Sequence, residues 1–228
     1  MKDLKGSMNI TNRNLKRRII EISYKKGLSH LGSCLTAVDI IKEIYDIKKP
    51  YEKFVLSSGH AGLALYVVVE KYFRDAVDTC VSHSAEYLFS KHGVHPNRDR
   101  HIDASSGSLG HGIGIAVGMA LADRSKNVYC LISDGECSEG SVWEALRISQ
   151  EQNLTNLQLY VNINSWGAYK KIDPDLLTQQ LNLVFPLGSN KYYTNVDYFP
   201  FLNQPTPQMA HYKVMTRQEY EMAMEILK

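Results

Sequence analysis

The sequence predicts an α/β protein in which a parallel sheet carries helices on both faces. The first observation is a continuous apolar run at residues 128–133, VYCLIS, which is typical of a strand buried on both sides. A second such run follows at residues 157–163. Between them Val142 and Leu146 recur at helical spacing, with Ser138 as the candidate N-cap. A strand, a crossover helix and a second strand form a right-handed unit with parallel strands.

Two polar residues stand directly after these strands. Asp134 follows the first strand in an Asp134-Gly135 turn, and Asn164 follows the second. Parallel α/β sheets bind ligands beyond the carboxyl ends of their strands, so both side chains fall at one edge. Mg²⁺ takes oxygen ligands of these kinds together with phosphates and water, and Gly135 lets the backbone approach a phosphate closely. We therefore expect a metal–diphosphate site. The alternative for this pair alone is that Asp134 turns the chain and Asn164 caps a loop.

The composition is that of an ordinary globular protein with one sizeable core. Its 228 residues are 44% hydrophobic and 22% charged, and 26 basic and 24 acidic residues give a net charge of +2. This balance gives no electrostatic case for nucleic acid. The longest apolar segment, residues 113–122, is too short to span a membrane, and the start of the chain lacks the apolar run of a signal peptide. The cysteines have no C-x-x-C spacing, which predicts reduced thiols in the cytoplasm: Cys34, Cys80, Cys130 and Cys137.

The first third of the chain predicts two helices and a short strand. Residues 11–26 form the first helix, and His30 lies in a turn before the second, amphipathic one. A single histidine at such a turn is often structural, so its role is open from this pattern alone. Residues 54–56 form a strand that places His60 at its carboxyl end, where a helix opens. His60 is therefore expected at the same edge of the sheet as Asp134.

Residues 75–105 are expected to be the least regular part of the chain. They hold four histidines, whose spacing allows zinc as an alternative, although no cysteine joins them: His83, His92, His95 and His101. The glycine-rich run at residues 107–112 then introduces a helix of small residues. A nucleotide loop is the alternative for this run, but the sequence has neither a G-x-G-x-x-G pattern after a strand nor a Walker lysine.

The C-terminal part predicts two further helices. One covers residues 173–185, with Pro174 near its first turn, and the last one opens at a capping box, Thr216 to Glu219. Residues 189–208 are expected to form a surface connection. We therefore divide the chain into a main domain at residues 1–188 and a C-terminal connection and closing helix of the same domain at residues 189–228.

The central stretch resembles the thiamin diphosphate motif, Gly-Asp-Gly followed after roughly thirty residues by Asn. It stands here as Ser133-Asp134-Gly135 and Asn164, with Ser133 in place of the first glycine. In proteins with this motif the metal is bound by the Asp and Asn side chains and by the main-chain carbonyl two residues after the Asn. The resemblance therefore implies Asp134, Asn164 and Trp166 as metal ligands, and a pyrophosphate-binding domain of the thiamin diphosphate-binding fold for residues 1–188.

The resemblance widens to the transketolases through SHLG, SSGHAGLALY, and KHGVHPNRDR followed by SSGSLGHGIGIAVGMALA. Leu31 and Asn97 depart from the family's usual proline and acidic residue. The match implies catalytic roles for His30, His60, His95 and Glu139. It implies cofactor contacts from His60, Gly107, Leu109, Asp134, Gly135, Glu139, Asn164 and Trp166. His211, in a C-terminal segment that is similar to short transketolase subunits, is a candidate for a further active-site histidine.

The resemblance implies an N-terminal subunit of a split transketolase, which uses thiamin diphosphate and Mg²⁺ or Ca²⁺. In transketolases the pyrimidine-facing glutamate and the sugar-phosphate arginines belong to the second domain, and nothing after residue 188 is long enough to be that domain. We therefore expect a heterotetramer with a separately encoded C-terminal subunit, and transfer of a two-carbon ketol unit between ketose and aldose phosphates. Two alternatives stay open. One is a related thiamin enzyme, 1-deoxyxylulose phosphate synthase-like or acyloin-forming, and the other is a scaffold subunit that has lost the cofactor.

Overall fold

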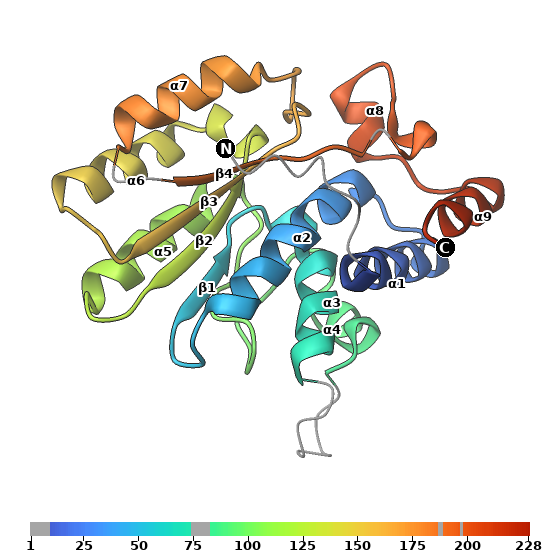
Figure 1. The fold of residues 1–228 in the computed structure, drawn as a ribbon, viewed down its shortest axis with the longest axis horizontal. Coiled ribbons are helices and arrows are strands. Elements are labelled where there is room, and N and C mark those ends of the chain that lie inside the picture. Colours follow the sequence, from blue (N-terminus) through green and yellow to red (C-terminus); the bar gives the residue numbers. More distant parts are fainter. Residues whose placement is uncertain (1–9, 74–82, 187–188, 197) are drawn as a thin grey trace.

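The structure, a computed structural model, describes residues 10–73, 83–186, 189–196 and 198–228. In this part of the chain a sheet lies between two layers of helices (Figure 1). Its strands run in the order β1 (Lys53–Leu56), β2 (Val128–Ser133), β3 (Leu157–Ile163) and β4 (Ser189–Tyr193), and all neighbours are parallel. The predicted parallel α/β fold is confirmed.

Alternation along the strands explains why both faces are covered. Phe54 and Leu56 of β1 and Tyr129 of β2 belong to one hydrophobic cluster, whereas Val55 and Cys130 belong to another on the opposite face. Successive side chains of a strand point to opposite faces, so a strand that is apolar throughout contributes side chains to a hydrophobic core on each face. The six residues of β2 are all buried, as this arrangement requires.

Helices from the two ends of the chain cover one face. The first cluster packs beneath α1 (Ile10–Lys26), α2 (Leu31–Ile47), α3 (Gly62–Phe73), α4 (Ala85–His92) and α9 (Arg217–Ile226). The other face is covered by α5 (His111–Ala122), α6 (Gly140–Glu151) and α7 (Pro174–Val184) (Figure 1). The short α8 (Pro207–His211) lies near α2, at the end of the sheet where β2 and β3 finish. Within the described ranges, no helix is both long and apolar enough to cross a membrane.

Three local predictions are corrected by the structure. Ser138 is not the N-cap of α6, because Gly135–Ser138 forms a 3₁₀ turn and Glu139 occupies the cap position. Residues 75–105 contain a regular helix, α4, whose N-terminus is capped by Ser84 through the amide of Tyr87. The segment at residues 189–208 is not only a connection, since its first part is β4, which extends the sheet next to β3.

The predicted N-terminal ends of α7 and α9 are confirmed. Asp173 accepts hydrogen bonds from the first amides of α7, where Pro174 occupies the first turn. Thr216 and Glu219 form the reciprocal capping box of α9. Both patterns depend only on neighbouring residues, which explains why they could be identified from the sequence.

Candidate functional site

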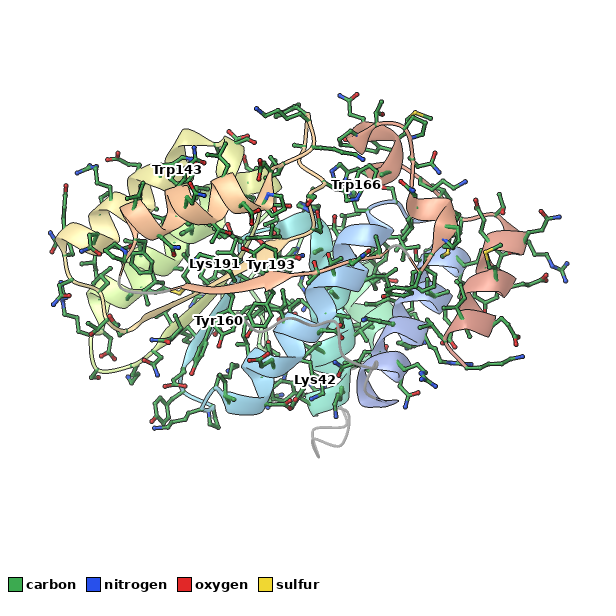
Figure 2. All side chains as sticks on the ribbon, turned by 45° about the horizontal axis from the view of Figure 1, so that its top comes forward. Lys42, Trp143, Tyr160, Trp166, Lys191 and Tyr193 are labelled. Carbon is green, nitrogen blue, oxygen red and sulfur yellow. The ribbon has the colours of Figure 1, made fainter. Side chains whose placement is uncertain are left out.

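A cavity of about 350 Å³ opens at the carboxyl ends of the central strands. Every site residue predicted above except Glu139 lines it: His30, His60, His95, Gly107, Leu109, Asp134, Gly135, Asn164 and Trp166. They come from segments far apart in the sequence, which the parallel sheet brings to one edge. Figure 2 shows Trp166 on the loop after β3, on the side of α8, well separated from Trp143 on α6.

Asp134 and Asn164 lie side by side because β2 and β3 are neighbours. The Asp134 carboxylate is 1% exposed, and its Oδ2 accepts hydrogen bonds from the amides of Asn164 at 2.9 Å and Ser165 at 2.7 Å. Its Oδ1 accepts one from the Gly135 amide at 2.9 Å. The Asn164 side-chain oxygen accepts a hydrogen bond from the Trp166 amide at 2.9 Å. The turn after β2 and the loop after β3 are thus joined through one carboxylate.

The electrostatics of Asp134 fit a bound cation. Burial raises the pKa of its carboxyl group to about 6, although the surrounding amides act in the opposite direction. Among the described residues, no lysine or arginine forms an ion pair with Asp134. A buried carboxylate without a cationic partner is costly, and a divalent cation offsets that cost with the oxygen chemistry that Mg²⁺ prefers. The donor set present here therefore fits the metal of a metal–diphosphate group.

Ser133 is accommodated without blocking the turn. Its hydroxyl accepts a hydrogen bond from the Glu136 amide at 3.3 Å, and its own amide donates to the Glu136 carboxylate at 3.0 Å. The serine side chain is therefore used within the turn, although the residue still borders the cavity. Gly135 lies close to the loop after β3, where an added Cβ would be 3.3 Å from the Ala168 amide nitrogen.

Three histidine rings cluster in the lining of the cavity. The ring centroids of His30 and His60 are 5.3 Å apart, and that of His211 lies 5.9 Å from His30. Burial, followed by the charge of neighbouring histidines, lowers the pKa of His30 to about 4 and that of His60 to about 3. Both rings are therefore neutral near pH 7. The Nδ1 atom of His30 is buried without a hydrogen-bond partner, so it can bind a polar group of a ligand.

His30 takes an unusual backbone conformation that fixes its ring at the cavity. Its φ of 57° is left-handed, and its amide donates a hydrogen bond to the His211 carbonyl at 2.6 Å. The His211 ring contacts the Gly167 carbonyl through Nε2 at 3.1 Å. The segment around α8 therefore contributes a wall to the cavity, which includes His211 and Tyr212.

The glycine-rich loop forms another part of the cavity lining, through Gly107 and Leu109. Gly110 has a φ of 73°, and a Cβ at this position would lie 2.3 Å from the Ser141 hydroxyl. A Cβ on Gly107 would lie 3.1 Å from the His95 ring. Both glycines therefore permit a close approach that a side chain would prevent, and Leu109 between them faces the cavity.

Glu139 lies beside this loop, outside the cavity lining. It occupies the N-cap of α6 without a side-chain cap bond, and its Cβ is 3.0 Å from where a Gly110 Cβ would stand. The fully buried carboxylate here is that of Glu136, which is 0% exposed. No local sequence pattern marks four buried polar residues here, because their partners lie far away along the chain: Glu136, Ser57, Thr36 and Asn162.

The alternative zinc cluster does not assemble. His95 lines the cavity, His92 contacts Asp99 at 3.0 Å, and His83 and His101 face each other with their Nε2 atoms 3.0 Å apart. No group of three or more potential His, Cys, Asp or Glu ligands is found in the described part of the chain. The three described cysteines are buried and unbonded, whereas Cys80 lies outside the described residues.

A parallel sheet with a metal-compatible carboxylate, an adjacent amide and a glycine-rich loop at its carboxyl edge defines an α/β domain of the thiamin diphosphate-binding fold. Comparison with known families agrees, since the family model described as "Transketolase, thiamine diphosphate binding domain" matches residues 29–168. The chain belongs to this transketolase family.

Two curated relatives show how much of a transketolase the chain corresponds to. Transketolase of Homo sapiens is 33% identical over 189 residues, which cover 76% of this chain and 30% of that protein. One of the subunits of apulose-4-phosphate transketolase from Phocaeicola vulgatus is 35% identical over 167 residues, which cover 65% of this chain and 58% of that protein. The chain thus spans less than two thirds of the length of both.

Solved structures agree on the fold. The crystal structure of transketolase from Campylobacter jejuni superimposes with a TM-score of 0.68 at 19% identity, covering 96% of this chain and 42% of that one. The Leishmania mexicana transketolase gives a TM-score of 0.55 at 16% identity, covering 97% of this chain and 44% of that one. At these identities the likeness establishes the fold.

Proposed function

We propose that this chain is the cofactor-binding N-terminal subunit of a split transketolase, a transferase of the transketolase class. Together with its partner it would transfer a two-carbon ketol unit between a ketose phosphate and an aldose phosphate. The observation that carries the proposal is the buried Asp134 carboxylate, which lacks a cationic partner among the described residues and borders a cavity together with Asn164. Membership of the transketolase family supports the same assignment.

The residues of the turn and loop would hold the cofactor's metal and diphosphate. We assign the Asp134 carboxylate, the Asn164 amide oxygen and the Trp166 carbonyl to Mg²⁺ or Ca²⁺, and Gly135 to the close approach of the diphosphate. Thiamin diphosphate, when bound, would supply an acidic carbon whose conjugate base adds to a carbonyl, and a ring that accepts electrons. Gly107 and Leu109 would contact the ring end of the cofactor, since both line the cavity and the family resemblance assigns them there.

The histidines would bind the sugar substrate and exchange protons with it. His30, His60 and His95 line the cavity, and because burial lowers the pKa values of His30 and His60, these two can exchange hydrogen bonds with hydroxyl groups as neutral rings. The unpartnered Nδ1 of His30 is the first candidate for such a contact. A neutral imidazole can also accept a proton and return it during group transfer.

The partner would complete the pyrimidine end of the site. We propose a C-terminal transketolase subunit that carries the pyrimidine-binding domain, with Glu139 at the junction and two copies of each chain in a cytoplasmic heterotetramer. The relative from Phocaeicola vulgatus is itself named as one subunit of its enzyme, which supports a split arrangement. Glu139 lies beside the glycine-rich loop and is half-buried, so part of its side chain would be open to a second chain.

Calorimetric titration with Mg²⁺ and thiamin diphosphate, with and without the partner chain, tests the assignment. We expect the wild-type chain to bind the cofactor and the Asp134→Ala variant to lose binding. The control is Asp175→Ala, which changes an exposed aspartate of α7 and should bind as the wild type does. Binding that survives Asp134→Ala would contradict the metal site. No binding in either condition would favour a scaffold subunit.

Turnover assays decide the reaction. Ketose and aldose phosphates should be converted only when the partner is added, and robust activity of the isolated chain would contradict the split-enzyme proposal. Conversion of pyruvate with an aldehyde phosphate, without ketol transfer, would instead indicate a 1-deoxyxylulose phosphate synthase-like enzyme.

A further inference from the structure

The buried carboxylate of Glu136 joins three segments that surround the proposed cofactor site. Its Oε1 accepts hydrogen bonds from the Ser57 hydroxyl at 2.7 Å and the Gly110 amide at 2.9 Å. Its Oε2 accepts one from the Ser133 amide at 3.0 Å. These donors belong to the end of β1, the glycine-rich loop and the end of β2, so one side chain connects all three.

Ser57 extends this connection to the first turn of α5. Its hydroxyl, which donates to Glu136, accepts a hydrogen bond from the Ile113 amide at 3.1 Å. The first amides of a helix have no partner within the helix, and Gly110, the N-cap residue, has no side chain to supply one. Ser57 and Glu136 therefore cap α5 from outside the helix.

The packing around these bonds leaves little room for another arrangement. A Cβ on Gly112 would lie 2.5 Å from the Ser57 Cα, and one on Gly59 would lie 2.7 Å from the backbone of Ser106 and Gly107. The loop is thus pressed against the end of β1. Its position relative to the turn after β2 depends on Glu136, which is the second residue after Asp134 and contacts the loop directly.

We infer that Glu136 is a positioning residue that holds the glycine-rich loop in register with the Asp134 turn. The inference rests on the proposed function, because the two parts it joins are those assigned to the ring and diphosphate ends of the cofactor. Glu136 itself is fully buried, does not line the cavity and so does not touch the ligand. It acts by setting where Leu109 stands relative to Asp134.

The variant Glu136→Gln tests this with little change in volume. A glutamine has one acceptor oxygen, so either the Gly110 amide or the Ser133 amide faces an NH₂ group and loses its bond. Amide hydrogen exchange of the ligand-free chain should show protection of Gly110 or Ser133 reduced about ten- to hundredfold, as expected for loss of a bond to a charged acceptor. In Ser57→Ala the loss should instead fall on Ile113, while Gly110 stays protected.

Ligand binding separates positioning from general stability. All variants are made in a chain that carries Trp143→Phe, so that Trp166 is the single remaining tryptophan. Its fluorescence reports binding, because Trp166 lines the cavity. We expect Glu136→Gln to weaken the affinity for Mg²⁺ with thiamin diphosphate about ten- to hundredfold, and that for Mg²⁺ with pyrophosphate less than about threefold. Pyrophosphate needs only the Asp134 end of the site.

The control is Glu144→Gln, a carboxylate with 58% side-chain exposure on α6, which should change neither affinity. Equal weakening of both ligands by Glu136→Gln, or unchanged protection of both Gly110 and Ser133, would overturn the inference. Failure of the wild-type chain to bind either ligand, both with and without the partner chain, would overturn the proposed function and, with it, the ligand part of this inference. The two failures are therefore distinguishable.

Discussion

The hydroxyl of Thr36 on α2 is expected to set the orientation of both asparagines that end β3. It accepts hydrogen bonds from the side-chain amide of Asn162 at 2.9 Å and from that of Asn164 at 3.4 Å. It also lies within hydrogen-bond distance of the Gly32 and Ser33 carbonyls, at 3.1 and 3.2 Å. With its NH₂ group held by Thr36, Asn164 points its oxygen the other way, where it accepts a hydrogen bond from the Trp166 amide at 2.9 Å and keeps a second lone pair for the proposed metal.

The variant Thr36→Val keeps the shape of the side chain and removes the hydroxyl. Thr36 is 2% exposed and Asn162 is 3% exposed, so the Asn162 amide would be left buried without this acceptor. Leaving such a donor unsatisfied costs about 1–3 kcal/mol, and we expect the free energy of unfolding to fall by about 2 kcal/mol. The Asn164 amide, no longer held, should weaken metal-supported binding of thiamin diphosphate about fivefold, which corresponds to about 1 kcal/mol.

Urea unfolding and calorimetric titration measure the two effects. Thr36→Ser retains the hydroxyl and should bind like the wild type, although it loses a buried methyl group. Combining Thr36→Val with Asn162→Ala isolates the pair, since contacting residues show a coupling energy of about 0.5–3 kcal/mol. A Val variant as stable as the wild type, or a Ser variant that binds no better than Val, would refute this reasoning.

Three further outcomes follow from local geometry. His60 has a folded-state pKa of about 3 against an ordinary value near 6.5, so the unfolded chain takes up its proton first and stability falls as the pH drops through this window. Between pH 7 and pH 5, the free energy of unfolding of His60→Gln should therefore fall by about 2 kcal/mol less than that of the wild type, as measured by urea unfolding. Gly110→Ala, with a left-handed φ and a Cβ 2.3 Å from the Ser141 hydroxyl, should cost about 2–4 kcal/mol. Gly114→Ala is its control, because a Cβ there meets nothing within 4 Å and should stabilise α5 by up to about 1 kcal/mol. Thr216→Ala should lower the melting temperature through the loss of about 1 kcal/mol of capping, and an unchanged melting temperature would contradict the capping box.

The sequence was most informative where structure depends on neighbouring residues. The apolar runs at β2 and β3, the breaks at Asp134 and Asn164, and the capping box at Thr216 each follow from spacing within a few residues. Since parallel strands end at one edge, the two breaks were enough to place the candidate site there. Of the site residues named from the family resemblance, all except Glu139 line the cavity.

The features that could not be predicted depend on contacts between distant segments. Glu136 meets Ser57 across 79 positions, and Thr36 meets Asn162 across 126, so no local pattern marks these residues. The error at Ser138 has a related cause: a 3₁₀ turn after β2 delays the start of α6, so the residue with the best capping side chain stands ahead of the cap. Strand β4 was missed because its sequence, SNKYY, lacks the apolar run of the inner strands.

The histidine wall of the cavity is supported by a contact outside the site. His211 and Tyr212 stand just before α9, which packs along α1 with the rings of Tyr24 and Tyr220 stacked at 4.4 Å. Arg17 of α1 also donates to the Leu227 carbonyl at 3.4 Å. Removing α9 would take the buried Ala223 out of the hydrophobic core on that face of the sheet, and it would also remove support from the cavity wall formed by His211 and Tyr212.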